Sequence, residues 1–454
     1  MQLPFPMHDN SSIRRWPFIL GTFACAVFLG CGKTEKPEFR LNMPEMVTAQ
    51  IIPQHQQEIA DTLAALFGTP DEPFALASTG LDVKKLRIAA GQVAGYEPGV
   101  KRGLYRQHCV HCHGINGDGH GPTAMILNPY PRDYRKGVFK FKSTYNPDRP
   151  ANEDLYAVLH DGIPGTSMPA FALLPPDEIA ALIEYVKYLS IRGQTETSLI
   201  GLVSQDLEYD PVTGVAAEGP EGKLDPANNA DQRAVIDEMI AEIVEGWQAA
   251  NDQRIVPEQQ FQPVDTRSVA QIAESAEKGR VLFYGERANC VKCHGPTALG
   301  DGQQNDFDVW MKENVAFREA TEKLPESIDT LEEELDSLDG DAYEEAEQEL
   351  SAKQNELIVR EQVVETLFPV RNAIPRNMRL GVYRGGRRPV DFFWRIHQGI
   401  AGTPMPATGP ASPGAQGTLT EEEMWNIVDY IRSVPFEPAS RPQLRLVENT
   451  EQVN

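Results

Sequence analysis

The chain has 454 residues, of which 41% are hydrophobic, so its length and composition allow two to three folded domains with buried cores. It carries 66 acidic and 42 basic side chains, and its formal net charge is −24. This acidic excess argues against nucleic acid or an anionic membrane surface as a partner. It favours either electrostatic steering toward basic surfaces of partner proteins or simple solubility.

Residues 1–30 have the pattern of an export signal. Arg14 and Arg15 form a positive region, and residues 16–30 are an uncharged, largely apolar run. This run is shorter than the roughly 20 residues that a transmembrane helix needs. The four residues that end at Cys31 resemble the lipobox of bacterial lipoproteins. The sequence therefore predicts a lipoprotein whose acylated Cys31 holds the chain to a membrane on the periplasmic side, with an uncleaved short anchor as the alternative.

Residues 31–90 are expected to form an N-terminal tether, in which the stretch from Gln57 to Phe67 is amphipathic. The following residues 91–192 are predicted to be the first compact domain. This domain is expected to end in a helix from about Pro176 to Leu189, because the apolar residues there fall on one helical face.

The first domain contains the motif C-x-x-C-H, which occurs again farther along the chain. The motif residues are Cys109, Cys112 and His113 in the first copy, and Cys290, Cys293 and His294 in the second. This motif is typical of c-type haem attachment, in which both thiols form thioether bonds to the haem and the histidine becomes an axial iron ligand. The sequence therefore predicts two covalently bound haem c groups. One zinc site made by the four cysteines, or a thioredoxin-like redox pair, are the alternatives.

Each motif is followed by a methionine in a Met-Pro-Ala triplet, Met168 in the first copy and Met405 in the second. A methionine thioether on the far side of a haem completes the iron coordination and raises the reduction potential. We therefore expect one iron between His113 and Met168 and the other between His294 and Met405. The competing ligands, each eight residues before the methionine, are His160 and His397.

The segments around the two motifs recur in the same order, which indicates an internal repeat of a whole domain. A Pro-Arg segment places Arg132 and Arg135 in the first copy at the same offsets as Arg376 and Arg379 in the second. A guanidinium group can bind a carboxylate through two parallel hydrogen bonds. We expect at least one arginine per domain, Arg132 and Arg376 foremost, to pair with the haem propionates. The alternative is that these arginines are surface charges.

Residues 193–268 are expected to link the domains, with a helix from Ala234 to Ala249. The second domain is predicted over residues 269–436, followed by a tail over residues 437–454. Its last helix is expected to start at a capping box, Thr420 to Glu423, and to turn Met424, Ile427, Val428 and Ile431 inward.

The second domain differs from the first by an insertion over about residues 306–368. Between Glu322 and Glu349 the insertion has thirteen acidic side chains and one basic side chain. Leucine and isoleucine residues recur there at helical spacing, which predicts an acidic antiparallel helical hairpin. The hairpin is expected either to dock on a partner or on the other domain, or to be a solvated decoration.

Both copies resemble class I cytochrome c domains. The resemblance rests on the two C-x-x-C-H motifs, the Gly-Asp-Gly and Pro-Arg segments and the methionine loops. The first copy is similar to mono- and dihaem cytochromes of respiratory complexes, including the third subunit of cbb3-type oxidases. The resemblance implies an all-α fold of two tandem class I cytochrome c domains, the second with an inserted helical hairpin. In each domain the N- and C-terminal helices are expected to cross beside the haem.

The resemblance implies electron transfer without independent catalysis. The chain would be a dihaem carrier or a cytochrome subunit of a membrane complex. Its donor and acceptor would be redox proteins, such as a quinol-oxidising complex or a terminal oxidase. A dihaem enzyme such as a peroxidase is the third class, but a peroxidase needs an open iron position, whereas each motif here has its own candidate methionine.

Overall fold

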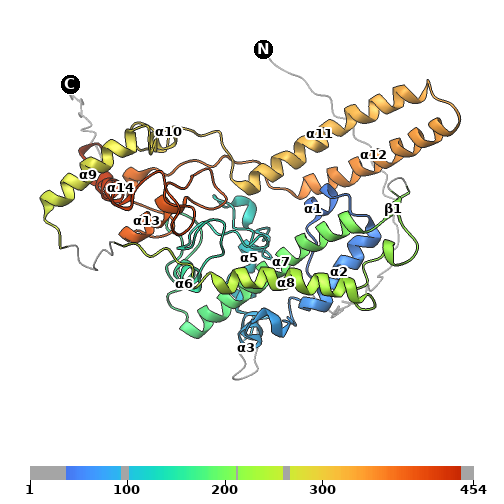
Figure 1. The fold of residues 1–454 in the computed structure, drawn as a ribbon, viewed down its shortest axis with the longest axis horizontal. Helices are drawn as coiled ribbons and strands as arrows, with labels where there is room; N and C mark the ends of the chain where they lie inside the picture. The colour runs from blue at the N-terminus through green and yellow to red at the C-terminus, as the bar shows by residue number, and fades with distance from the viewer. Residues whose placement is uncertain (1–36, 94–101, 211–212, 259–265, 441–454) are drawn as a thin grey trace, which may run out of the picture. The chain divides into compact units, whose positions relative to one another are not determined.

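The computed structural model describes residues 37–93, 102–210, 213–258 and 266–440. The predicted signal peptide, the lipidation site Cys31 and the tail beyond residue 440 lie outside the described residues. The described chain is mostly helical, as expected (Figure 1). Its strands β1 (Tyr209–Asp210) and β2 (Val215–Ala216) form an antiparallel pair. Within the ranges given above, no helix is both long enough and apolar enough to cross a membrane.

A long helix, α7 (Pro176–Asp206), is the centre of the core of residues 37–258, which we call the first half. The helices α1 (Met43–Thr48), α2 (Pro53–Phe67) and α3 (Val83–Ala89) pack against α7. The predicted amphipathic stretch lies within α2. The tether expected over residues 31–90 is therefore wrong from residue 37 onward, because that segment is part of the core.

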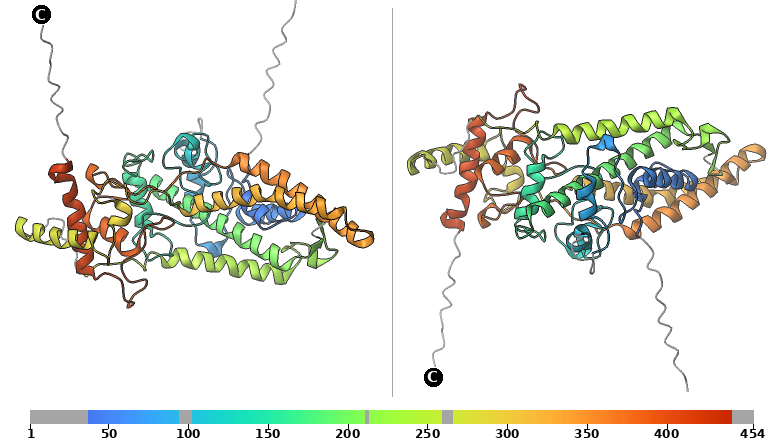
Figure 2. Two further views of the ribbon diagram at one scale, coloured as in Figure 1. Left: turned by 90° about the horizontal axis from the view of Figure 1, so that it is seen from above. Right: turned by 90° about the horizontal axis from the view of Figure 1, so that it is seen from below.

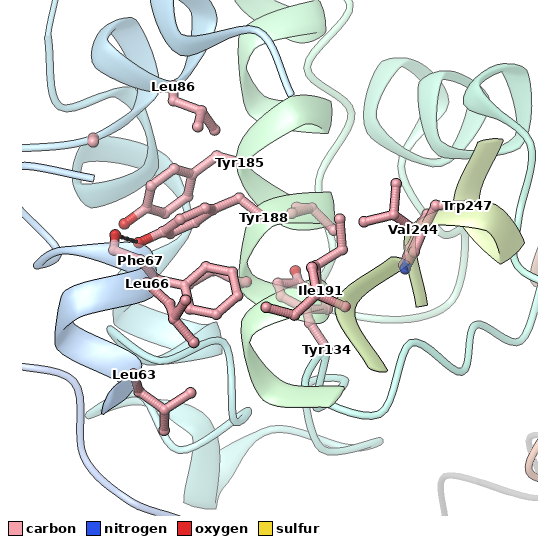
Figure 3. Close-up of a cluster of buried hydrophobic side chains, with 14 of the residues drawn as sticks. Leu63, Leu66, Phe67, Leu86, Tyr134, Tyr185, Tyr188, Ile191, Val244 and Trp247 are labelled. Atoms are coloured by element: carbon pink, nitrogen blue, oxygen red, sulfur yellow. Dashed lines mark hydrogen bonds between the residues drawn. The ribbon is translucent and has the colours of Figure 1, made fainter. Parts of the chain in front are cut away.

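Aromatic residues join the N-terminal helices to α7 (Figure 3). Phe67 at the end of α2 lies beside Tyr188 of α7, with the ring centroids 6.0 Å apart. The Tyr188 hydroxyl also donates a hydrogen bond of 2.5 Å to the carbonyl of Phe67. Both side chains are almost completely buried, as is Leu86 of α3. These contacts fix α2 and α3 on one side of α7.

Helix α7 is longer than the expected segment from Pro176 to Leu189. The helix continues because both apolar and polar side chains of its next turns are buried. Arg192 donates a hydrogen bond of 3.2 Å to Glu196, and Glu196 also accepts one of 2.6 Å from the backbone N–H of Asn42. Buried charges are stable when they are paired and hydrogen-bonded, as these are.

The expected linker over residues 193–268 is also largely folded into the first half. Helix α8 (Ala230–Ala249) confirms the predicted helix and begins four residues earlier, where the Asn229 side chain accepts hydrogen bonds from two backbone N–H groups. Its buried side chains Val244 and Trp247 lie across α7 from α2 and α3 (Figure 3). The linker therefore contributes to the core.

The candidate site residues lie on short helices and on the loops between them. In the first half these helices are α4 (Leu104–His108), α5 (Val110–His113) and α6 (Asn152–Asp161). Residues 266–440, which we call the second half, contain α9 (Val269–Tyr284), α10 (Val291–His294), α13 (Pro389–Gln398) and α14 (Glu421–Ser433). The 3-10 turns are η1 (Ala77–Thr79), η2 (Ala124–Ile126), η3 (Pro220–Gly222), η4 (Met378–Leu380), η5 (Val434–Phe436) and η6 (Pro438–Ser440).

Helices α9 and α14 cross in close contact at Gly279. A Cβ atom at this position would overlap the carbonyl group of Asn426 and lie 2.8 Å from the amide nitrogen of Ile427. Only glycine allows the two backbones to approach this closely. The predicted capping box at Thr420 and the predicted inward residues of α14 are confirmed.

Two long antiparallel helices, α11 (Val309–Leu335) and α12 (Gly340–Thr366), occupy the predicted insertion (Figures 1 and 2). Their base packs on α1, where Val47 is buried with Phe317 and Val363. Lys136 of the first half also forms an ion pair with Glu313 of α11. The base of the hairpin is therefore fastened to the first half, while acidic residues toward its tip are exposed.

Candidate functional site

The first C-x-x-C-H motif lies on and just before the single turn of α5. The backbone N–H of His113 donates to the carbonyl of Cys109 at 2.9 Å, so the turn holds both cysteines and the histidine on one short segment. Cys109 is buried and Cys112 is half-buried, and both are free thiols. Burial raises the pKa of Cys109 to about 12, so that this cysteine is a neutral thiol at pH 7.

The ring of His113 is held in a defined orientation. Its Nδ1 lies 3.1 Å from the carbonyl oxygen of Arg132, and its ring stacks on Tyr134 with the centroids 4.6 Å apart. A carbonyl can only accept a hydrogen bond, so Nδ1 carries the proton and Nε2 keeps its lone pair. Burial lowers the pKa of His113 to about 4, which keeps the imidazole neutral. A neutral imidazole with one nitrogen fixed by a backbone carbonyl is the form that binds a metal.

The second motif repeats this arrangement with one difference. The backbone N–H of His294 donates to the carbonyl of Cys290 at 2.9 Å. Burial lowers the pKa of His294, and the carbonyl of Arg376, the counterpart of Arg132, partly offsets this effect. The Nδ1 atom of His294 is nevertheless buried without a hydrogen-bond partner among the described residues. Cys290 and Cys293 are free, half-buried thiols, and burial raises the pKa of Cys290 to about 11.

The two methionine loops have the same hydrogen bonds. In the first loop, the backbone N–H of Ile163 donates to the Met168 carbonyl at 3.2 Å, and the Met168 N–H donates to the Thr166 hydroxyl at 3.1 Å. The corresponding bonds in the second loop, at Ile400, Thr403 and Met405, are 3.2 and 3.3 Å long. Both methionine side chains are half-buried. Each loop thus presents its methionine on the same backbone frame.

The loop after each motif is repeated as well. The backbone N–H of Gly119 donates to the His113 carbonyl at 3.0 Å, and that of Gly300 donates to the His294 carbonyl at 2.9 Å. Each of these glycines has a positive φ and lies against the carbonyl of the proline in the Pro-Arg segment. The two halves therefore share the geometry of the whole path from the motif to the Pro-Arg segment.

The four arginines of the Pro-Arg segments have different partners. Arg135 forms a two-pronged ion pair with Asp133. Arg379 forms an ion pair with Glu437 through a single contact of 3.0 Å. Arg132 and Arg376 have no carboxylate within 4.0 Å in the described parts of the chain. Arg132 lies over the ring of Trp310, 3.3 Å from its centre. Arg376 donates to the carbonyl of Val382 at 3.0 Å.

The competing histidines have other partners. His160 stacks on Tyr156 at an exposed position and lies 2.7 Å from the carboxylate of Asp161. His397 is buried, and its ring contacts those of Phe393 and Tyr145. The Nδ1 atom of His397 is buried and has no hydrogen-bond partner among the described residues.

The motif residues fit covalently bound haem better than zinc. All four thiols are free, the imidazole of His113 is buried and that of His294 is half-buried, and a half-buried methionine follows each motif. Among the residues that the structure describes, no three or more histidine, cysteine, aspartate or glutamate side chains gather as a metal-binding group. This finding argues against the single zinc site that was the alternative for the four cysteines.

Sequence reasoning did not identify three residues that lie close to the Pro-Arg segments. Lys140 lies 5.8 Å from the ring centre of Trp310, and the charge of Arg384 acts on both Lys140 and Arg376. The repeat could have marked two of them, because Lys140 and Arg384 each lie eight residues after the first arginine of their Pro-Arg segment. Trp310 belongs to the insertion and has no counterpart in the first half, so only the fold brings it to this place.

Comparison with known proteins identifies part of the chain. The cytochrome c family model matches residues 102–190. No curated protein matches the chain. Among solved structures, a chain of the reducing HAO-like protein complex of Kuenenia stuttgartiensis is similar, with 18% sequence identity and a TM-score of 0.40 over 73% of this chain and 93% of that chain. Because the matched residues include Cys109, Cys112, His113 and Met168, residues 102–190 are a cytochrome c domain, which implies haem c bound at the first motif.

Proposed function

We propose that the chain is a dihaem c-type cytochrome that transfers single electrons in a bacterial respiratory chain. One observation supports the proposal of a second haem. The hydrogen bonds around the motif and the methionine loop of the first half are repeated in the second half. The two halves have different surroundings, so this agreement in detail supports two tandem domains with the same ligand set.

The residues have defined roles in this proposal. Cys109 and Cys112 would hold the first haem through thioether bonds, and His113 and Met168 would bind its iron. In the second half the same roles belong to Cys290, Cys293, His294 and Met405. Bound haem c supplies one-electron chemistry, as its iron alternates between Fe(III) and Fe(II). The protein excludes water, fixes the His113 tautomer through the Arg132 carbonyl and supplies positive charge from Arg132 and Arg376 for the propionates.

The proposed location is the periplasmic side of the membrane, with the chain held there by lipid on Cys31. The export pattern of residues 1–30 and the lipobox-like residues 28–31 support this location. Replacing Cys31 by serine is expected to move the protein from the membrane fraction to the soluble periplasmic fraction. Retention of Cys31→Ser in the membrane fraction would contradict the lipid anchor.

The mass of the exported protein tests the number of haems. We expect the wild-type protein to carry the mass of two haem groups. The variants Cys109→Ser/Cys112→Ser and Cys290→Ser/Cys293→Ser should each carry one, and the variant with all four substitutions none. A wild-type protein that carries a single haem would overturn the dihaem proposal but not the cytochrome c domain.

A redox titration followed by visible absorption tests the ligands and separates electron transfer from catalysis. Two one-electron waves, with a weak sulfur-to-iron band in the oxidised form, are expected for His/Met ligation. Carbon monoxide binding to the reduced, folded protein, together with reduction of hydrogen peroxide, would instead favour the peroxidase alternative. Purification from solubilised membranes separates the remaining classes, since co-purifying oxidase or dehydrogenase subunits indicate a complex subunit and a lone dihaem protein indicates a carrier.

A further inference from the structure

Four basic residues gather where the two halves meet. Arg132 and Lys140 belong to the first half, and Arg376 and Arg384 belong to the second; we call them the junction cluster. In a chain with a net charge of −24, the one acidic partner among the described residues within 4.0 Å of these four is Asp308, whose carboxylate lies 3.0 Å from Lys140. This concentration of positive charge calls for anions that the protein itself does not supply.

One side of the junction links Arg132 to the methionine loop of the second half. The guanidinium group of Arg132 lies 3.3 Å from the ring centre of Trp310, at the start of α11. The same indole ring packs on Gly402, two residues after Ile400, and a Cβ atom there would lie 2.5 Å from it. The backbone N–H of Val309 also donates to the Gly402 carbonyl at 2.9 Å. Trp310 is therefore placed between the two halves.

The other side of the junction links Arg376 to the methionine loop of the first half. Gly165 lies so close to the guanidinium group of Arg376 that a Cβ atom there would overlap it unless the arginine side chain moved. Gly165 and Gly402 are equivalent positions in the repeat, as are Arg132 and Arg376. Each half therefore directs the arginine of its Pro-Arg segment toward the methionine loop of the other half.

The donors of the junction are incompletely paired. The Nε atom of Arg384 and the indole nitrogen of Trp310 are both buried, and neither finds a hydrogen-bond partner in the described residues. Burial lowers the pKa of Lys140 to about 8, and the neighbouring charge of Arg132 adds to this effect, while Asp308 opposes it. Buried cations and donors without partners are costly, so such a cluster is stable when anions bind it.

We propose that the junction cluster binds the propionates of both haems, with the indole N–H of Trp310 as a further donor, so that the two haems face each other and exchange electrons within the chain. Propionates fit because they are carboxylates and accept bidentate hydrogen bonds from guanidinium groups. The inference rests on the proposed function, since it requires a haem in each half. It adds Lys140, Arg384 and Trp310 to the haem-binding residues and gives the insertion a role between the two sites.

The reduction potentials of the two haems test this proposal in the full-length, haem-loaded protein. Arg384→Gln and Lys140→Gln each remove one positive charge, from the second and the first half respectively. Loss of a cation beside the propionates disfavours the reduced state, so each variant is expected to lower both potentials. For scale, a shift of about 59 mV in a one-electron potential corresponds to a tenfold change in that reduction equilibrium. Trp310→Phe keeps the ring but removes the donor, and should lower both potentials by less.

Arg387→Gln is the matched control, because Arg387 is an exposed residue on the same loop as Arg384. It should leave both potentials unchanged. The masses of the wild-type protein and of every variant are measured first. A wild-type protein that carries only one haem would refute the proposed function, not the junction proposal. With two haems present, the junction proposal is overturned if Arg384→Gln and Lys140→Gln behave like the control, or if each shifts only the haem of its own half.

Discussion

Replacing Gly279 by alanine should force α9 and α14 apart. The added Cβ would overlap the Asn426 carbonyl group and lie 2.8 Å from the Ile427 nitrogen, whereas ordinary contacts begin at 3.4 Å. The obstacle is backbone, which cannot rotate away, so the helices must separate by more than about 0.5 Å. A gap of about 0.5–1 Å forfeits about a quarter to a half of the dispersion energy of each contact. The contacts at stake include those of Phe283, Ile427 and Val428, which are fully buried.

Overpacking of a core typically costs about 1–3 kcal/mol, and a backbone obstacle places this site at the upper end of that range. Alanine regains about 1 kcal/mol through its higher helix propensity. We therefore expect Gly279→Ala to lower the free energy of unfolding by about 2 kcal/mol net. The measurement is urea denaturation of the haem-loaded protein followed by far-UV circular dichroism.

Gly201 provides a control within the same fold. It lies in α7, and a Cβ atom there would meet nothing within 4 Å. Gly201→Ala should therefore raise the free energy of unfolding by about 0.5–1 kcal/mol. If Gly279→Ala is as stable as the wild-type protein, or gains stability as Gly201→Ala does, the close helix crossing is refuted.

Three further predictions concern other buried contacts. Tyr188→Phe removes one of two donors to the Phe67 carbonyl, which keeps its 2.7 Å bond from the backbone N–H of Phe74. The variant should lower the free energy of unfolding by about 0.5–1.5 kcal/mol, and an unchanged urea midpoint would contradict this. Phe317→Ala leaves a cavity in the packed base of the hairpin and should lower the free energy of unfolding by about 3 kcal/mol. Amide hydrogen exchange in α1 should become faster. Unaltered exchange there would show that α1 does not depend on the hairpin. Burial lowers the pKa of Lys142 to about 8, against 10.5 for the unfolded chain, so between these values the unfolded state binds more protons and stability rises with pH. That rise should be about 2 kcal/mol between about pH 7.5 and about pH 9.5, and Lys142→Met should lack it in parallel urea denaturations; an equal rise in both proteins would sink the assignment to Lys142.

Local sequence patterns predicted the elements whose signals lie within a few residues of one another. The capping box at Thr420, the helix that ends at Ala249 and the paired helices of the insertion are such elements. The turns of the two motifs and the two methionine loops also belong here, because each is held by hydrogen bonds between residues within a few positions of one another. In each case the residues that define the feature are neighbours in the chain.

Features that depend on distant partners were not predicted. The residues from 37 to 93 form short helices whose apolar partners lie more than a hundred positions away on α7, so their sequence resembled a tether. The continuation of α7 past Leu189 depends on burial of Arg192 and Glu196. From the local sequence alone, these charged residues are expected at the surface. The junction of Trp310 with Arg132 needs the insertion, the Pro-Arg segment and the second methionine loop together.

The base of the hairpin also constrains the order in which the chain can assemble. Val47 and Phe317, which are buried together, are 270 positions apart in the sequence. Pairings of such high contact order form late, because a long loop must close before the pairing contributes stability. A chain that is synthesised from its N-terminus can therefore complete α7 early, but Val47 is covered only after the insertion has been made. A fragment that stops before Val309 would carry this apolar surface uncovered, which makes the truncated product prone to aggregation.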